Sequence, residues 1–134
     1  MGTWHDSILR VRFEETDFVG VVYYSKFFNW LEVGRVNLFR HLGVDLRELA
    51  QSGFHIPVVQ AHADYRSPAR FDDEVLVRTR IAKLGNSSIR FENEIYRLPE
   101  KTLLCTGYTV HVLTNNRGKP LRIPADLRKK LTSF

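Results

Sequence analysis

Residues 25–43 read SKFFNWLEVGRVNLFRHLG, and this stretch decides the fold. Its apolar residues recur at spacings of three and four, the period of a helix with one wide apolar face, and they are Phe27, Phe28, Leu31, Leu38, Phe39 and Leu42. Ser25 is expected to cap the start of the helix, and Gly43 can end it in the left-handed conformation. Gly34 costs about 1 kcal/mol relative to alanine inside a helix, and close packing against a sheet is the expected compensation. A long helix over residues 25–42 is therefore predicted to lie on a sheet.

The remaining segments predict that sheet. Residues 7–14 alternate, with Leu9, Val11 and Phe13 on one face, which is the period of a half-buried strand. Four segments after the helix alternate or run apolar between turn-rich clusters, and these strands are expected over 55–65, 74–83, 88–97 and 103–113. Short helices are expected over 45–52 and 124–130. This order predicts an α+β fold in which a curved, five-stranded antiparallel sheet wraps around the long central helix.

Size, charge and cysteine content limit the function classes. A chain of 134 residues is expected to form one domain, 1–134, with a real core. The single cysteine, Cys105, cannot form an internal disulfide, and the polar N-terminal segment lacks the apolar run of a signal peptide or a membrane span, so a cytoplasmic protein is expected. The net charge of +5 suits several anionic partners, but the basic residues are scattered, which argues against nucleic acid.

Common catalytic and cofactor signatures are absent from the sequence. The five histidines and one cysteine include no pair at zinc-type spacing, so no metal site is expected. There is also no GxSxG elbow, Walker loop or GxGxxG turn, and no resident cofactor is expected.

The segment 15–24, ETDFVGVVYY, is the strongest candidate for chemistry. It places a carboxylate, Asp17, and a glycine turn at Gly20 directly before the start of the long helix. Free backbone N–H groups and the positive dipole end of a helix can stabilise an oxyanion that forms on a carbonyl. A nearby carboxylate can then attack the carbonyl carbon or activate a water molecule.

Several ordered motifs resemble one known family. They are Thr16-Asp17, Gly20-Val21-Val22-Tyr23 before Phe27-Phe28, RSPARFDD at 66–73, GNSS at 85–88, and GKP at 118–120 before Ile123-Pro124. Together they resemble the hotdog-fold thioesterases of the 4-hydroxybenzoyl-CoA thioesterase type and the related Tol-Pal-associated acyl-CoA thioesterases. The resemblance spans nearly the whole chain and implies a hotdog fold and an acyl-CoA thioesterase that releases a carboxylic acid and CoA.

The resemblance also implies roles for particular residues. Asp17 would be the nucleophile or general base, and the backbone N–H of Tyr24 would polarise the thioester carbonyl. Many family members carry histidine where this chain has Tyr24, so a mechanism that needs imidazole is not expected here. A CoA site at a subunit interface is implied near the hairpin, and the candidate substrate-binding residues are Lys83, Asn86, Ser87, Ser88, Arg70 and Arg90. The family further implies a homotetramer built from dimers.

Three rival functions remain open at this level. An acyl carrier protein could present the thioester in place of CoA, since a basic surface suits an acidic carrier. Hotdog dehydratases and hydratases usually pair histidine with a carboxylate, and no histidine lies near Asp17 in the sequence. A non-catalytic acyl-CoA-binding module would have the same pocket without turnover. The sequence also leaves the acyl group open, because aromatic and aliphatic groups both need an apolar pocket.

Overall fold

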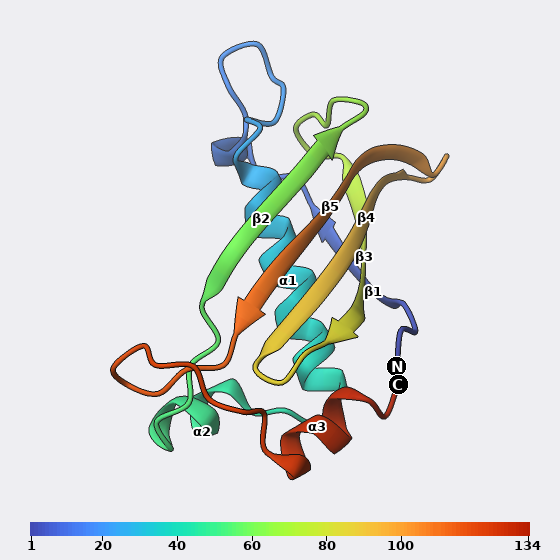
Figure 1. Cartoon of the computed structure of the whole chain (residues 1–134). Helices are drawn as coiled ribbons and strands as arrows, with labels where there is room; N and C mark the ends of the chain where they lie inside the picture. Colours follow the sequence, from blue (N-terminus) through green and yellow to red (C-terminus); the bar gives the residue numbers. More distant parts are fainter.

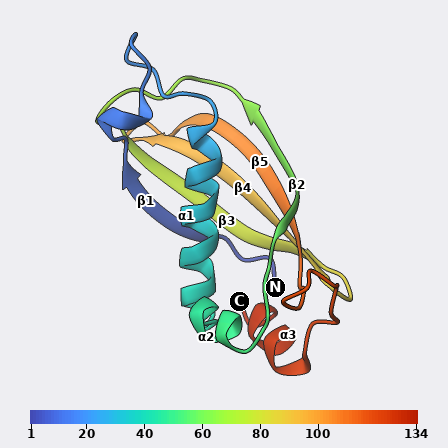
Figure 2. The same ribbon diagram turned by 90° about the vertical axis from the view of Figure 1, so that its left-hand side faces the viewer.

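A five-stranded antiparallel sheet forms the main layer of the protein, and the computed structural model describes all 134 residues. In chain order the elements are β1 (His5–Arg10), a 3-10 turn (Phe13–Glu15), α1 (Lys26–His41), α2 (Leu46–Gln51), β2 (Val58–Tyr65), β3 (Glu74–Leu84), β4 (Ser88–Leu98), β5 (Thr102–Val112) and α3 (Ala125–Leu131). The spatial order of the strands is β1-β3-β4-β5-β2, so β1 and β2 are the two edges. Figure 1 and Figure 2 show the sheet curving around α1, which confirms the expected hotdog architecture.

Helix α1 packs closely on the sheet at Gly34. A side chain at this position would overlap the hydroxyl of Thr79 and would place its Cβ 2.9 Å from Val77 Cγ1, both on β3. The missing side chain therefore lets the helix backbone approach the strand, and the expected compensation for a mid-helix glycine is confirmed. The six buried residues of the helix share this face, and they are Phe27, Trp30, Leu31, Gly34, Leu38 and Phe39.

The core divides into two clusters along α1. The first gathers around the N-terminal half of the helix and includes Phe27, Trp30, Leu31, Val75, Val77, Ile95 and Leu104. The second gathers around the C-terminal half, where α3 closes that end of the molecule, and includes Leu38, Phe39, Ile89, Phe91, Leu113, Leu127 and Leu131. The two ends of the helix therefore have different surroundings.

The first strand is shorter than the sequence pattern predicts. Strand β1 pairs with β3, and Arg10 lies opposite Glu74, the first residue of that strand. Beyond this pair Val11 still exchanges backbone hydrogen bonds with Asp73 and Asp72, at 2.9 and 3.1 Å, and the chain then turns away so that residues 13–15 form a 3-10 turn. Phe13 is 76% exposed, so its prediction as an inward-facing strand residue is wrong. The alternation of apolar and polar residues therefore extends further along the sequence than the backbone pairing of β1 with β3.

Two of the expected helix caps differ in outcome. Asp45 caps α2, and its Oδ1 accepts hydrogen bonds from the backbone N–H groups of Arg47 and Glu48. Ser25 makes no such bond, because its backbone is already helical, with φ −67° and ψ −21°. The prediction of Ser25 as a side-chain cap is therefore wrong, and the start of α1 is uncapped.

No helix of the protein is long and apolar enough to cross a membrane.

Strand β2 is an exposed edge. It pairs only with β5, and Val58, Val59 and His62 are all exposed. His62 stands on the uncovered face of the sheet with its Nε2 3.1 Å from Asp64 Oδ2. It is not a core residue, because nothing in the chain covers this face of the edge strand.

Candidate functional site

A closed loop carries Asp17. Thr16 pairs with Val22 across the base of the loop, and Gly20 takes a left-handed φ of 83° at its turn. Asp17 Oδ1 accepts hydrogen bonds from the backbone N–H groups of Val19 at 2.9 Å and Val21 at 3.1 Å. The carboxylate is thus fixed through one oxygen, while Oδ2 makes no hydrogen bond within the chain. That oxygen is free to act on another molecule.

The side chain of Glu15, two residues earlier, has different surroundings from that of Asp17. Its side chain is buried, with the residue 5% exposed. Its Oε1 accepts the backbone N–H of Arg12 at 2.8 Å, and its Oε2 accepts the indole N–H of Trp30 at 2.8 Å. Its backbone carbonyl accepts the N–H of Tyr23 at 2.9 Å, which ties the loop to the start of α1. Glu15 therefore holds the loop in place, and Asp17 is the carboxylate left available for chemistry.

The start of α1 offers unused hydrogen-bond donors. The backbone N–H groups of Tyr24 and Ser25 make no hydrogen bond within the chain, and no side chain caps the helix. Such groups carry the positive end of the helix dipole and suit a negatively charged oxygen. The phenol of Tyr24 lies beside Tyr23, with ring centroids 4.9 Å apart, and the residue is 61% exposed. The backbone of Tyr24 is thus free whatever its side chain does.

A hollow of about 310 Å³ opens beside these donors. Its lining combines aromatic and polar residues from the start of α1 and from the end of β2 with the turn that follows, and comprises Val22, Tyr24, Phe27, Tyr65, Arg66, Ser67 and Pro68. A larger hollow, of about 430 Å³, lies at the other end of α1 beside Val36 and Arg40. The smaller one is the relevant one, because it adjoins the free N–H groups.

The Tyr65 hydroxyl donates to the backbone carbonyl of Tyr24 at 2.9 Å. Its ring stands edge-on to that of Phe27, with centroids 5.2 Å apart. Burial raises the pKa of Tyr65, with smaller contributions from Cys105 and Tyr24, so the phenol keeps its proton at neutral pH. Burial also raises the pKa of the Cys105 thiol to about 12, which leaves it a poor nucleophile.

The predicted substrate-binding residues do not gather around Asp17. The β3–β4 hairpin carries Lys83 near the end of β3, Asn86 and Ser87 in the turn, and Ser88 at the start of β4. Figure 1 shows this turn at the end of the sheet opposite the loop of Asp17. Backbone carbonyls of this turn are already bonded, since Asn86 accepts Ile123 N at 2.8 Å and Ser87 accepts Leu113 N at 2.8 Å. One chain therefore does not bring this turn and Asp17 together.

Arg70 and Arg90 also lie apart from each other. Arg70 pairs through its backbone with Val21, so it stands beside the Asp17 loop, and its guanidinium makes no ion pair. Arg90 lies on the uncovered face of the sheet, where its guanidinium sits 3.9 Å from the ring centre of Tyr108 and 3.5 Å from Glu92 Oε2. Of the two, only Arg70 is placed near the candidate site.

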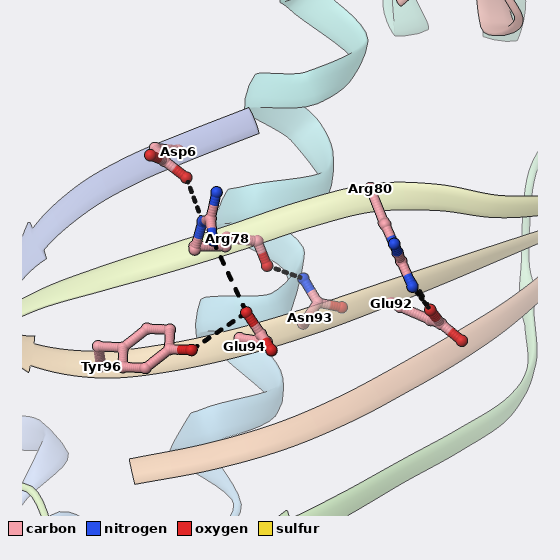
Figure 3. A network of polar contacts seen from close by, with 7 residues as sticks. All are labelled: Asp6, Arg78, Arg80, Glu92, Asn93, Glu94 and Tyr96. Atoms are coloured by element: carbon pink, nitrogen blue, oxygen red, sulfur yellow. Dashed lines mark hydrogen bonds and ion pairs between the residues drawn. The ribbon is translucent and has the colours of Figure 1, made fainter. Parts of the chain in front are cut away.

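The uncovered face of the sheet carries an alternating network of charges (Figure 3). Arg80 makes a forked contact with Glu92 Oε1 at 3.1 and 2.7 Å. Arg78 lies between Asp6 at 2.9 Å and Glu94 at 3.8 Å. Because these charged groups pair with one another, we interpret the network as a structural feature of the sheet and not as a ligand-binding site.

No three His, Cys, Asp or Glu side chains come together in a way that could hold a metal ion.

Sequence reasoning missed three residues of the site. Glu15 and Asp17 are two ionisable residues of one loop in the sequence, and the bonds of Glu15 with Arg12 and Trp30 separate their roles. Tyr65 and Arg66 were not identified, because nothing in a single sequence connects the end of the first strand after the helix with the helix start. The available signals were a tyrosine at a strand end and the motif RSPARFDD at 66–73, whose first residue is Arg66.

Comparisons with known proteins agree on one family. Residues 11–131 match the model of the thioesterase-like superfamily. The chain is 31% identical over 123 residues to an acyl-CoA thioesterase of Haemophilus influenzae, covering 90% of this chain and 88% of that protein. It is 29% identical over 134 residues to a chloroplastic acyl-acyl carrier protein thioesterase of Arabidopsis thaliana, covering all of this chain and 70% of that protein.

A solved structure supports the fold independently. A 1,4-dihydroxy-2-naphthoyl-CoA thioesterase from Synechocystis superposes with a TM-score of 0.89, at 22% identity, and each chain is covered to 96%. The identity is low, so this likeness bears on the fold alone. The family resemblance expected from the motifs and the hotdog fold that it implied are both confirmed.

Proposed function

The chain belongs to the thioesterase-like superfamily and is a thioester hydrolase, and from this premise we propose that it cleaves acyl-CoA with Asp17 as its reacting carboxylate. The observation that carries the proposal is the pairing of a fixed but half-free carboxylate with uncapped N–H groups at the start of the next helix. Both groups are available for a substrate because neither is used up inside the chain.

The free groups suit the two needs of thioester hydrolysis. The N–H groups of Tyr24 and Ser25 would receive the carbonyl oxygen as it becomes negative, and such donors are each worth about 10² to 10³ in rate. Asp17 Oδ2 would then attack the carbonyl carbon to give a mixed anhydride that water cleaves, or it would take a proton from a water molecule that attacks instead. In both routes the carbon–sulfur bond breaks, CoA leaves as the thiol, and one water molecule is consumed. Neither route needs a cofactor.

Two forms of the thioester fit this site. Acyl-CoA is the substrate we propose, as for the Haemophilus influenzae relative. The Arabidopsis thaliana relative acts on acyl-acyl carrier protein, and the net charge of +5 would favour an acidic carrier as well. The aromatic walls of the hollow, from Tyr24, Phe27 and Tyr65, suit an apolar acyl group. Arg66 at its rim is an exposed cation without an ion pair, placed to meet an anionic part of the substrate.

We propose that the working form contains at least two copies of the chain and is a homotetramer. The exposed edge strand β2 has one unpaired side that a second copy could extend, since an open edge favours strand pairing. A second copy is a possible source of a β3–β4 turn beside Asp17, because one chain does not bring the two together. The uncovered face bears three arginines, Arg78, Arg80 and Arg90, against Asp6, Glu92 and Glu94, a balance that suits a second sheet.

A reducing compartment such as the cytoplasm suits this protein. Its one cysteine, Cys105, is fully buried in the first core cluster. A disulfide would require this thiol to leave the core, so the fold is built for the reduced form.

The test of the function is CoA release from a panel of thioesters. Benzoyl, hydroxybenzoyl, phenylacetyl and C4 to C16 acyl-CoAs would be offered to the protein, and a thiol reagent would report free CoA. The same acyl groups on a carrier protein form a matched second panel. Turnover of part of the CoA panel supports the proposal, and turnover of the carrier panel alone would shift the substrate class. If neither panel is cleaved although acyl-CoA binds, the chain is a binding module.

A further inference from the structure

Tyr65 ties the edge of the sheet to the start of α1. It is the last residue of β2, and its hydroxyl donates to the carbonyl oxygen of Tyr24 at 2.9 Å. The backbone N–H of Phe27 donates to the same oxygen at 3.3 Å, in a 3-10-type bond that joins residues three apart at the start of the helix. The oxygen therefore accepts two hydrogen bonds, one from within the helix and one from a different element of the fold.

The geometry of a peptide group gives this contact a consequence at the site. A trans peptide is planar, and its C=O and N–H point in opposite directions. The carbonyl of Tyr24 and the N–H of Ser25 belong to one peptide, so a bond that fixes the carbonyl also fixes the N–H. The N–H of Ser25 is one of the two unused donors at the helix start. Hydrogen bonding at the carbonyl further polarises the peptide and strengthens its N–H as a donor.

We infer that Tyr65 is a positioning residue, which holds the Tyr24–Ser25 peptide so that the N–H of Ser25 receives the carbonyl oxygen of the substrate beside that of Tyr24. This inference rests on the proposed thioesterase function and adds to it a second donor and the side chain that orients it. The first turn has no side-chain cap, so Tyr65 is the group outside the helix that fixes this peptide.

The surroundings of Tyr65 support this role. Its ring stands edge-on to Phe27, at 5.2 Å, and to Tyr24, at 6.4 Å, so the phenol approaches from one direction. A phenol is protonated at neutral pH, which is the form that donates, and burial raises the pKa of Tyr65 further from that range. Both Tyr65 and Tyr24 line the 310 Å³ hollow, so the contact lies at the wall of the cavity that adjoins the donors.

The variant that tests the inference is Tyr65→Phe, which keeps the ring and removes the hydroxyl. If the N–H of Ser25 is no longer held in place, kcat should fall about tenfold and KM should stay within about twofold, because this donor stabilises the oxyanion that develops in the transition state. Tyr96→Phe is the matched control. Its hydroxyl donates to Glu94 Oε1 at 3.1 Å on the uncovered face of the sheet (Figure 3), which is the face opposite to α1 and its free N–H groups. Tyr65 donates to a neutral carbonyl and Tyr96 to a carboxylate, so the control removes a hydroxyl whose bond is at least as strong.

A pair of uncleavable analogues separates positioning from a structural effect. One replaces the thioester sulfur with CH₂ and keeps the carbonyl, and the other is an alkyl-CoA thioether without a carbonyl. Tyr65→Phe is expected to weaken binding of the ketone about fivefold to tenfold and to leave thioether binding unchanged, by calorimetry. Equal effects on both analogues, no effect on the ketone, or an unchanged kcat would overturn the role of Tyr65. A wild type that binds neither analogue and cleaves no thioester would instead overturn the proposed function, and the inference with it.

Discussion

The two ends of helix α1 differ in how their polar groups are satisfied. At the C-terminal end the N–H of Val44 bonds the carbonyl of Phe39 at 2.9 Å, the ammonium of Lys130 reaches the carbonyl of Gly43 at 3.2 Å, and α3 covers the second core cluster. At the N-terminal end, Tyr24 and Ser25 keep free N–H groups. The polar groups at the C-terminal end are therefore satisfied within the chain, whereas the N-terminal end keeps donors that the proposed function assigns to a substrate. The comparison predicts that changes at the two ends affect different measurements.

The largest effect on stability should come from Phe39→Ala. Phe39 is 2% exposed and packs edge-on against Phe91, with ring centroids 5.5 Å apart. Removing this ring should lower the free energy of unfolding by about 3 to 5 kcal/mol, measured by urea denaturation, while kcat per folded molecule stays the same. The matched change Phe18→Ala removes a fully exposed ring at the other end and should leave stability within about 0.5 kcal/mol. Equal losses in the two variants would contradict the comparison.

His111 should make the C-terminal end sensitive to acid. The residue is 1% exposed, its Nδ1–H donates to the carbonyl of Ile56 at 3.0 Å, and burial lowers its pKa to about 4. Between pH 6.5 and pH 4 the unfolded chain binds a proton here that the folded chain does not, so stability falls as the pH falls. The loss should reach about 2 to 3 kcal/mol and be absent above pH 6.5.

The check on His111 is the pH dependence of urea denaturation. Wild type and His111→Asn should have different slopes of unfolding free energy between pH 6.5 and pH 4, with the shallower slope in the variant. Parallel slopes would mean that this histidine is not held neutral by the fold.

The smallest effects should come from two candidate caps. Asp45→Ala removes an oxygen that accepts the N–H groups of Arg47 at 3.0 Å and Glu48 at 3.1 Å, and should cost about 1 kcal/mol. Ser25→Ala removes a hydroxyl that makes no capping bond, and should change the unfolding free energy by only a few tenths of a kcal/mol. Thermal denaturation of the two variants compares the start of α2, which has a side-chain cap, with the start of α1, which has none. A similar loss for both would show that Ser25 caps α1 in solution.

The sequence predicted the regular parts of the fold because local patterns encode them. The spacing of Phe27, Leu31 and Leu38 locates the helix, and Gly34 indicates its close contact with the sheet. Phe13 shows the limit of this reasoning. The alternation that predicts a strand continues past Arg10, but a strand also needs a partner, and β3 begins opposite that residue. Partner availability is a property of the folded sheet and does not appear in the pattern of one segment.

The candidate site was predictable only in part for a related reason. Asp17 and Tyr24 lie seven positions apart on one segment, so their association could be expected from the sequence. The difference between Glu15 and Asp17 depends on Trp30, which lies on the helix, and the contact between Tyr65 and Tyr24 joins positions 41 apart. The CoA site near the β3–β4 turn was expected at a subunit interface, and within one chain this turn lies at the end of the sheet opposite the Asp17 loop. Contacts between segments that are distant in the sequence depend on the topology of the fold, which the identity of single residues does not reveal.

The most direct test of the account is the activity of Asp17→Asn on the preferred acyl-CoA. The amide still offers an oxygen to the N–H groups of Val19 and Val21, so the loop should stay closed and the melting temperature should stay close to that of the wild type. Asp126→Asn, an exposed aspartate on α3 at the other end of the molecule, is the control and should keep full activity. We predict that kcat falls by about 10³ or more in Asp17→Asn, equivalent to about 4 kcal/mol of barrier. A folded Asp17→Asn protein that releases CoA within about tenfold of the wild-type rate would contradict the central claim that this carboxylate carries the chemistry.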